Sequence, residues 1–462
     1  MNTNHPCTAP VKRVKRLFSC TLLLATCAQP LWATAPEFPE HVLFVNAQTG
    51  SVRGDGSRQK PFKDLQKAID KAEPGTTICV AEGNYLGTLD QGFITVDKYI
   101  TIRGGYNSAF TELDFTKYLT TIRPAPQQAG TSTHYSLLAL NITGNATGNA
   151  VIEGLMLDRG QMSNYNAPNP AKPDSCTPVG CETGMLLPPG RGGVGGTTGG
   201  VTVERPLLSG TCEGNVTIRH CAFANGSHYA VVLGSRTGTV EISDCVFVAN
   251  RMAACEVRGL TADLANNHCH FHHNTVLFSW CREKYMGDMG YGYRYMTGIN
   301  SDVHHNIFAC SNLAALDRSR TQNTKADEAK RETSAHHNIF FMNNADLSLP
   351  SGGGKWLFVP AARFEEVEQL KEYEGNMELP AGPMADALRA AIDPAYLNGF
   401  CNLTTSETQN YDPGSAANEI RRALGLNQRG TQTVRVSMFA NRYPFSAVPR
   451  LFGAVPEYGA RK

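Results

Sequence analysis

Short stretches of alternating apolar and polar residues recur along the middle of the chain, each with the same face directed inward. These stretches are residues 217–223, 241–247, 272–276, 304–308 and 336–340. The steps between successive anchors are 24, 29, 32 and 32 residues (245−221, 274−245, 306−274, 338−306), with the anchors taken as Cys221, Cys245, Asn274, Asn306 and Asn338. Repeats of this length that are rich in β-branched residues and lack helical periodicity predict a solenoid of stacked strands.

A different pattern precedes the repeats and predicts a cap on the solenoid. Residues 41–45, 77–81 and 99–105 read as strands, and residues 151–157 read as an earlier coil of the repeat. Between the first two strands, residues 61–72 predict an amphipathic helix, because apolar side chains recur at helical spacing: Phe62, Leu65, Ala68, Ile69 and Ala72. A helix at this place would cover the apolar interior and the unpaired strand edge of an open solenoid end.

The opening segment carries a more specific likeness. Its motifs are GDGS at 54–57, PF at 61–62, LQKAID at 65–70, PG at 74–75, TI at 77–78 and VAEGNY at 80–85. In these motifs the chain resembles secreted right-handed parallel β-helix proteins of the pectate-lyase-like superfamily, and the likeness extends through the repeats to about residue 348. The resemblance implies an all-β, right-handed parallel β-helix with three strands per coil. It implies little about the reaction, because that superfamily contains lyases, hydrolases, epimerases, esterases and non-catalytic adhesins.

The N-terminus has the features of an export signal. Residues 1–35 combine the basic residues Lys12, Arg13, Lys15 and Arg16 with an apolar stretch and a small-residue cleavage motif. The protein is therefore expected to be secreted or periplasmic. Beyond this signal, no stretch is long and apolar enough to predict a transmembrane segment.

The rest of the chain is expected to form two regions. Residues 36–350 would be the β-helix domain, with loop insertions at about 160–212, 287–298 and 321–333. Residues 351–462 would be an irregular region packed on the β-helix, with helices predicted at 362–373, 383–392 and 416–426.

Composition agrees with a turn-rich β protein. The 462 residues include 44 Gly and 25 Pro, and only 18% of residues are charged. A formal net charge of +1 gives no electrostatic argument for nucleic acid as a partner. We expect a monomer whose partner is a polysaccharide.

The repeated anchor positions favour structural roles. Cys221 and Cys245 would be small buried apolar rungs, a role that we favour over disulfide pairing. The anchor Asn residues would form a ladder of side-chain amides between coils. The paired His residues that precede them (272–273, 304–305 and 336–337) suggest a metal array at first sight. Because they recur at a fixed repeat position, we favour the interpretation that they are stacked rungs.

Charge concentrates on one predicted sheet. Counting about eight residues from each anchor predicts strands at 229–233, 253–257, 282–286 and 314–318. Equivalent residues of neighbouring coils would lie about 4.8 Å apart. Successive coils then present Glu256 and Arg258, next Arg282, Glu283, Lys284 and Tyr285, and finally Asp317, Arg318 and Arg320. In the proteins that this chain resembles, this sheet and the turn after it commonly form the substrate groove.

These residues suit β-elimination of a uronate-containing polysaccharide. That reaction requires a cation to neutralise the sugar carboxylate and stabilise the enolate-like transition state. Arg282 and Arg318 would provide the cation, because a guanidinium binds a carboxylate through two parallel hydrogen bonds. Lys284, whose pKa the neighbouring Arg residues would lower, would be the base. Tyr285 would supply a phenolic acid or base.

Two further groups of residues complete the predicted groove. The substrate-binding group consists of Arg258, Arg320, Tyr291, Tyr293 and Tyr295, in which the Tyr rings would stack on sugar faces. The metal-binding group consists of Glu256, Glu283 and Asp317, which would hold Ca²⁺ as cofactor through carboxylate oxygens.

The same residues allow other interpretations. Glu256, Glu283 and Asp317 could serve a glycoside hydrolase, at separations of about 5 or 10 Å for one or two coils. Interleaved Arg and Lys residues argue against this, because they would keep a general acid ionised. The charges could also be a ladder of salt bridges on a non-catalytic, glycan-binding surface protein. A one-residue slip of strand register near Trp280 would exchange Lys284 for Glu283 or Tyr285.

Overall fold

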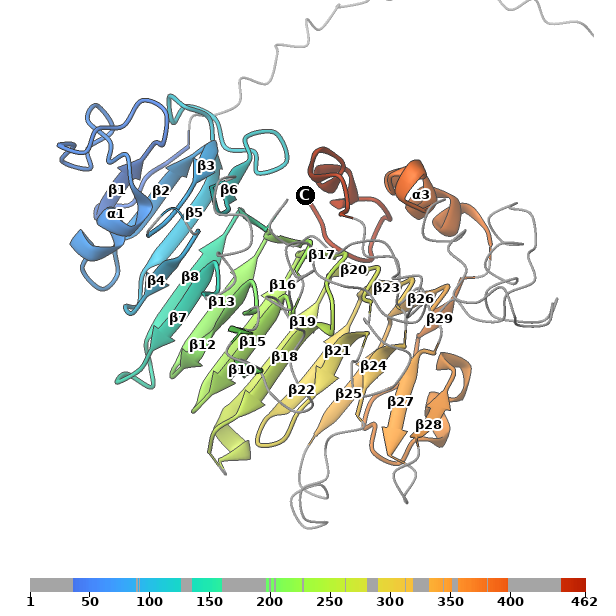
Figure 1. Cartoon of the computed structure of the whole chain (residues 1–462). Helices are drawn as coiled ribbons and strands as arrows, with labels where there is room; N and C mark the ends of the chain where they lie inside the picture. Colours follow the sequence, from blue (N-terminus) through green and yellow to red (C-terminus); the bar gives the residue numbers. More distant parts are fainter. Residues whose placement is uncertain are drawn as a thin grey trace, which may run out of the picture. The chain divides into compact units, whose positions relative to one another are not determined.

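The computed structural model describes one compact unit within residues 36–462. Within it, the described ranges are 36–88, 90, 92–125, 135–159, 197–198, 201–202, 205–226, 228–261, 263–280, 290–311, 313–318, 332–343, 345–350, 356–379, 381–397 and 442–462. These residues form three nine-stranded sheets that wind around a common core (Figure 1). The predicted fold, an all-β right-handed parallel β-helix, is confirmed.

Each coil contributes one strand to each sheet. Sheet 1 contains β1 (Val42–Val45), β2 (Thr77–Ala81), β5 (Thr101–Tyr106), β8 (Asn149–Glu153), β13 (Asn215–Arg219), β16 (Gly238–Ser243), β19 (Asn267–His272), β22 (Asn300–His304) and β25 (Thr333–His336). Sheet 2 contains β3 (Gly83–Tyr85), β6 (Thr120–Ile122), β9 (Leu155–Asp158), β14 (Ala222–Ala224), β17 (Val246–Val248), β20 (Thr275–Leu277), β23 (Ile307–Ala309), β26 (Ile339–Phe341) and β29 (Met377–Glu378).

Sheet 3 contains β4 (Ile94–Val96), β7 (Leu138–Ile142), β12 (Leu208–Cys212), β15 (Val231–Ser235), β18 (Ala253–Gly259), β21 (Tyr291–Tyr295), β24 (Ala314–Asp317), β27 (Leu347–Pro350) and β28 (Trp356–Val359). Within these three sheets, neighbouring strands are parallel except for the last pair, in which β28 folds back antiparallel on β27. The described backbone at 197–198 and 201–202 forms a separate antiparallel pair, β10 (Thr197–Thr198) and β11 (Val201–Thr202).

The N-terminal cap forms as predicted. Helix α1 (Leu65–Lys71) buries Leu65, Ala68 and Ile69. It begins where the Asp64 carboxylate accepts a hydrogen bond from the Lys67 amide at 2.8 Å, the interaction that stabilises a helix N-terminus. The helix lies against β1, β2 and β4, so it covers the apolar interior at the first coil (Figure 1).

The anchor alignment is confirmed residue by residue. The residues that follow successive anchors pair in register, for example Ala222 with Val246 and Ile307 with Ile339. Each anchor is preceded by a residue in the left-handed region, with φ between 51° and 54°: His220, Asp244, His273, His305 and His337. This conformation turns the chain from sheet 1 into sheet 2, and residues other than Gly adopt it only when the surroundings hold them there.

The Asn ladder holds these turns. The side-chain oxygen Oδ1 of Asn306 accepts from both the backbone amide and the side-chain amide of Asn274, at 2.9 and 3.1 Å. The Asn306 side chain donates in turn to Asn338 at 2.9 Å and to the Phe271 carbonyl at 2.9 Å. Asn376, which the repeat analysis missed, receives the last bonds of the ladder from Asn338. Polar side chains with buried partners on both sides thus replace apolar packing at this corner.

The core is made of inward-facing side chains that stack from coil to coil. Phe223 and Phe247 stack with ring centroids 4.9 Å apart, and Phe308 and Phe340 follow further along. Cys221 and Cys245 are fully buried free thiols, as predicted for apolar rungs.

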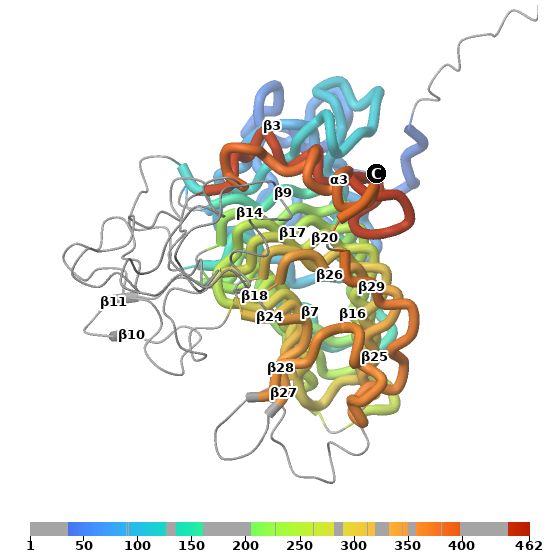
Figure 2. Tube along the Cα trace, turned by 90° about the vertical axis from the view of Figure 1, so that its right-hand side faces the viewer, coloured from blue at the N-terminus to red at the C-terminus, as the bar shows by residue number. Residues whose placement is uncertain are grey.

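The C-terminal region is more irregular. It contains a 3₁₀ helix (Ala361–Glu366), helix α3 (Pro383–Ala391) and a second 3₁₀ helix (Phe445–Leu451). The helix predicted at 383–392 therefore forms, but 362–373 makes only a short 3₁₀ turn, and 416–426 lies outside the described residues. Residues 442–462 lie along sheet 2 near the centre of the coil stack (Figures 1 and 2). In the described part of the chain, no helix has the length and apolar character needed to cross a membrane.

Candidate functional site

The outer face of sheet 3 carries a row of charged residues in register. Glu256 on β18 pairs with Arg294 on β21, and Arg294 pairs with Asp317 on β24. Their sequence neighbours on these strands, Tyr293 and Tyr295 among them, belong to the apolar core. Strand alternation therefore directs Glu256, Arg294 and Asp317 away from the core. We call these three residues the charged row.

The charged row is held together by one guanidinium. Arg294 donates to the Glu256 carboxylate at 2.7 Å from Nη1 and to the Asp317 carboxylate at 2.8 Å from Nε. Nη1 also donates to the Tyr229 hydroxyl at 2.8 Å. Ser348 donates to the second Asp317 oxygen at 2.9 Å. Two carboxylates on neighbouring coils therefore share a single cation.

Burial makes these contacts energetically important. The exposed fractions of Glu256, Arg294 and Asp317 are 1%, 2% and 1%. Burial alone would lower the pKa of Arg294, but Tyr229, Asp317 and Glu256 outweigh it and raise that pKa well above its usual value. Removing one partner of such a buried set costs about 3–5 kcal/mol, because the remaining charge is left uncompensated.

One nitrogen of Arg294 is not used within the row. Among the described residues, Nη2 has no hydrogen-bond partner although it is buried. Buried polar atoms nearly always have a partner, so this nitrogen is available to an acceptor from outside the row, such as water or a ligand.

The remaining predicted residues of this sheet lie around the row. Arg258, two positions beyond Glu256 on β18, forms a salt bridge with the second Glu256 oxygen, and 38% of its side chain is exposed. Arg318 follows β24 directly and is 2% exposed. Arg282, Glu283, Lys284, Tyr285 and Arg320 lie outside the described residues.

The prediction that residues 282–286 form the strand beside Glu256 is wrong. That position is taken by β21, inside the segment 287–298 that was predicted to be a loop insertion. The turn from sheet 2 into sheet 3 is longer in this coil: β21 begins 14 residues after β20 ends (291−277), whereas β18 begins 5 residues after β17 ends (253−248). The prediction that each strand of sheet 3 starts about eight residues after its anchor therefore placed this strand too early in the chain and missed Arg294. The alternating sequence Tyr-Gly-Tyr-Arg-Tyr at 291–295 was the available signal.

The predicted sugar-stacking Tyr residues are buried. Tyr291, Tyr293 and Tyr295 are at most 1% exposed. Tyr293 packs on Phe271 with ring centroids 4.9 Å apart, and its hydroxyl lies 3.1 Å from Ser301 Oγ. Tyr291 lies under the Arg294 guanidinium, 5.6 Å away. Strand alternation places Tyr293 and Tyr295 in the apolar core, whereas Tyr291 belongs to a separate buried cluster beside the charged row. None of the three rings has an exposed face for a sugar in this structure.

The predicted Ca²⁺ ligands have a different partner. Glu256 and Asp317 both bind Arg294, so a cation already lies between them. No group of three or more His, Cys, Asp or Glu side chains that could hold a metal ion occurs in the part of the chain that the structure describes. Ca²⁺ as cofactor remains a prediction that involves Glu283.

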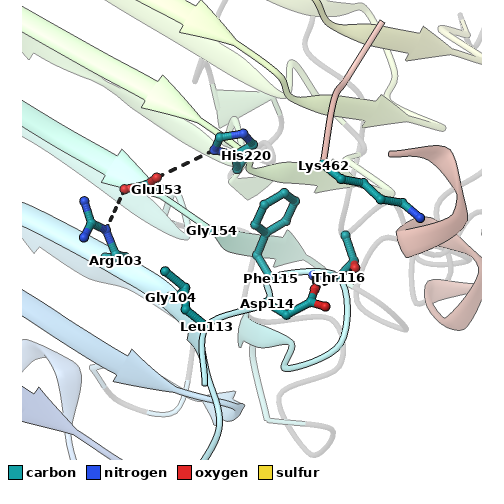
Figure 3. A pocket seen from close by; sticks show the side chains of 10 residues that line it. All are labelled: Arg103, Gly104, Leu113, Asp114, Phe115, Thr116, Glu153, Gly154, His220 and Lys462. Carbon is teal, nitrogen blue, oxygen red and sulfur yellow. Dashed lines mark hydrogen bonds and ion pairs between the residues drawn. The ribbon is translucent and has the colours of Figure 1, made fainter. Parts of the chain in front are cut away.

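A second polar site lies at the corner between sheets 1 and 2. It is a pocket of about 340 Å³ lined by Arg103, Asp114, Phe115, Glu153, His220 and Lys462, among others (Figure 3). Three basic side chains surround the Glu153 carboxylate. Its oxygens lie 2.8 Å from Arg103 Nε, 3.1 Å from Arg219 Nε and 3.7 Å from His220 Nδ1. Burial would raise the pKa of Glu153, but His220 and the two Arg side chains lower it to about 2. Glu153 is thus an ionised structural centre that cannot act as an acid near neutral pH.

Sequence comparisons with known proteins match only part of the chain. Residues 48–134 match the model of a family described as a protein of unknown function, DUF1565. An uncharacterized protein, YwoF, from Bacillus subtilis (strain 168) is 42% identical over 59 residues, which is 13% of this chain and 13% of YwoF. The chain therefore matches well under two thirds of the length of this relative.

Solved structures resemble the chain over a longer range but weakly. The structure of pectin methylesterase PemA from Erwinia chrysanthemi has a TM-score of 0.36 and 12% identity, covering 75% of this chain and 92% of that chain. The pectin methylesterase from Aspergillus niger has a TM-score of 0.33 and 12% identity, covering 76% of this chain and 89% of that chain. Values this low do not transfer an activity to the chain, so its function must be argued from its own residues.

Proposed function

We propose that the protein is a carbohydrate-active β-helix enzyme that cleaves a uronate-containing polysaccharide by β-elimination at the charged row. The observation that carries the proposal is the buried Arg294 nitrogen that has no partner among the described residues. A guanidinium N–H prefers a carboxylate oxygen as acceptor. The carboxylate of a uronate sugar would supply that acceptor.

The charged row gives Arg294 the properties that this role requires. Glu256 and Asp317 fix two of its nitrogens at 2.7 and 2.8 Å, so the guanidinium is held in one orientation. A donor that is already oriented needs no rearrangement when charge develops on the substrate. Because Arg294 is only 2% exposed, the substrate can reach it only when the surface over the row opens.

Two groups are proposed for abstracting the proton. Lys284, with Arg282 and Tyr285 beside it, precedes β21 in the same coil and remains the base proposed from the sequence. Tyr229 is the alternative, because its hydroxyl oxygen accepts a hydrogen bond from Arg294 at 2.8 Å. Arg318, Arg258 and Arg320 are proposed to bind further carboxylates along the polymer.

A hydrolase is the second candidate, favoured by the carboxylate pair alone. Glu256 and Asp317 are bridged by one side chain, and glycosidases use two carboxyl groups that flank the scissile bond. However, both carboxylates already bind the Arg294 guanidinium, so neither is free to reach a glycosidic oxygen as a general acid must. This candidate therefore ranks below the lyase.

The product distinguishes the candidates. The full chain is incubated with a panel of uronate polymers, with and without Ca²⁺, while ultraviolet absorbance and reducing ends are followed. The proposal predicts growing absorbance, since β-elimination leaves an unsaturated sugar. New reducing ends without absorbance would indicate the hydrolase, and binding without either product would indicate a non-catalytic glycan-binding protein.

Variants locate the reaction. Arg294→Lys keeps a positive charge but loses the oriented N–H, and we expect about a 100-fold lower rate. Arg363→Lys, on the exposed 3₁₀ helix of the C-terminal region, is the matched control and should keep full activity. Equal rates for wild type and Arg294→Lys, with both proteins folded, would place the chemistry elsewhere.

A further inference from the structure

Six His side chains form two stacked columns at the corner between sheets 1 and 2. The first column consists of His272, His304 and His336, with ring centroids 4.8 and 5.0 Å apart. The second consists of His273, His305 and His337, with spacings of 5.0 and 5.2 Å. The register of the coils places these rings in columns, but the adjacent Asn ladder already holds the turns and the proposed reaction does not use the His side chains.

Within each rung, the two rings face each other through the same nitrogen. The Nδ1 atoms of His336 and His337 lie 3.0 Å apart, and those of His304 and His305 lie 2.9 Å apart. The rings of each pair are nearly perpendicular, at 88° and 89°. This geometry recurs because one member of each pair ends a strand of sheet 1 and the next adopts the left-handed conformation.

The surrounding carboxylates decide where the protons lie on His336. Its Nε2 is 3.0 Å from Asp302 Oδ1 and 3.4 Å from Glu372 Oε2. An ionised carboxylate only accepts hydrogen bonds, so Nε2 carries the proton and Nδ1 of a neutral His336 presents a lone pair toward His337. A carboxylate behind a His ring is also the usual second partner of a metal-binding His, because it fixes the tautomer.

The separation of the two Nδ1 atoms matches two adjacent ligands of one metal ion. Metal–nitrogen bonds of about 2.0–2.1 Å at an angle of about 90° place two nitrogens about 2.9 Å apart. Square-planar and tetragonal sites of this angle are typical of Cu²⁺ and Ni²⁺ with nitrogen and oxygen ligands, and Cu²⁺ binds most strongly in the divalent series.

One ion would occupy one pair. The centroids of equivalent rings in adjacent rungs are at least 4.8 Å apart, and the rings are nearly parallel, so their equivalent nitrogens are about as far apart. Two metal–nitrogen bonds of about 2.1 Å span at most about 4.2 Å. A pair therefore supplies two nitrogens, and water would complete the coordination. Because dedicated metal centres use three or four protein ligands, we expect modest affinity.

The neighbouring carboxylates favour binding of a cation at the end of the columns formed by His336 and His337. Asp302 and Glu372 lie beside His336, and Glu374 interacts electrostatically with both His336 and His337. At the other end, Arg461 lies near His273 and opposes a cation there. His337 is exposed, so an ion can reach the pair from solvent.

We propose that the His336–His337 pair binds a divalent transition-metal ion, Cu²⁺ foremost, through both Nδ1 atoms, and that His304–His305 forms an equivalent second site. On binding, the proton between the two nitrogens leaves Nδ1 of His337 and a proton is taken up at its Nε2, so the neutral pair releases no net proton. The site is independent of the charged row on sheet 3.

Titration with Cu²⁺ tests the site. The full chain, without a polyhistidine tag and stripped of metal, is titrated calorimetrically at pH 8, and its electron paramagnetic resonance spectrum is recorded. We expect splitting from two imidazole nitrogens per ion and an upward shift of the melting temperature on adding Cu²⁺. A folded wild-type protein that shows no Cu²⁺ binding at millimolar concentration would overturn the proposal.

Asn substitutions give matched variants, because Asn tolerates the left-handed conformation that His305 and His337 adopt. We expect His337→Asn to weaken Cu²⁺ binding at least about tenfold, and His305→Asn/His337→Asn to abolish the two-nitrogen spectrum. His220→Asn is the control, since His220 has the same backbone conformation but follows Arg219 rather than a second His. An unchanged spectrum in the double variant, or an equal loss in the control, would contradict the assignment.

Discussion

Sheet 3 and the corner between sheets 1 and 2 use polar residues in opposite ways. At the corner, the same residue types recur from coil to coil, and Asn274, Asn306 and Asn338 bond to their own equivalents. On sheet 3, each coil contributes a different residue, and Glu256, Arg294 and Asp317 bond to one another. Repetition makes a structural ladder, whereas the departure from repetition assembles a site that does not recur in the described coils.

The largest effect is expected from removing the cation of the charged row. Arg294→Met removes the guanidinium that Glu256 and Asp317 share, although Arg258 still pairs with Glu256 and Ser348 still donates to Asp317. We expect a loss of about 3–5 kcal/mol in the free energy of unfolding, because two buried carboxylates lose their common cation. Chemical denaturation measures it. Adding Glu256→Gln and Asp317→Asn to this variant should recover part of the loss, and no recovery would mean that the two carboxylates do not depend on Arg294.

A smaller loss is expected from breaking the ladder at the corner. Asn306→Ala leaves the Asn274 amide and the Phe271 carbonyl without their buried partners, and we expect a loss of about 2–3 kcal/mol. Asn376→Ala, at the end of the ladder, should cost less because its surroundings are only partly buried. Equal effects at both positions would show that the ladder does not depend on burial.

The pocket at the corner predicts a pH dependence. Because the pKa of Glu153 is lowered to about 2 from its usual value of 4.5, its stabilisation is complete above about pH 4.5 and is lost as the pH falls through 2. Between pH 6 and pH 3 the wild type should lose about 1–2 kcal/mol more than Glu153→Gln. Glu112→Gln, which removes an exposed carboxylate, serves as the control. An identical pH profile for wild type and Glu153→Gln would refute the effect.

The smallest effect concerns a residue that sequence analysis assigned to substrate binding. Tyr293→Phe removes only a buried hydroxyl bonded to Ser301, so we expect a loss of about 1 kcal/mol in the free energy of unfolding and unchanged glycan binding. Thermal melting and a binding titration measure both quantities. If Tyr293→Phe instead bound glycan much more weakly and kept its stability, Tyr293 would have to be assigned to substrate binding.

The contrast between the two regions also explains what the sequence could predict. The five anchors, the strand Thr77–Ala81 and the capping helix follow from local pattern, because each repeats a spacing or covers a defined edge. Arg294 did not follow, because the turn before β21 is longer than the turns in the neighbouring coils and no local pattern fixes its length. Without the register, Arg294 could not be placed between Glu256 and Asp317, and the burial of Tyr293 could not be inferred.

The most direct test of the account compares turnover of one uronate polymer by wild type, Arg294→Lys and His337→Asn under identical conditions. We expect that only Arg294→Lys loses formation of unsaturated product, by about 100-fold, while His337→Asn matches wild type. Full turnover by Arg294→Lys together with a loss in His337→Asn would contradict it, since the chemistry would then depend on the repeated corner and not on the charged row.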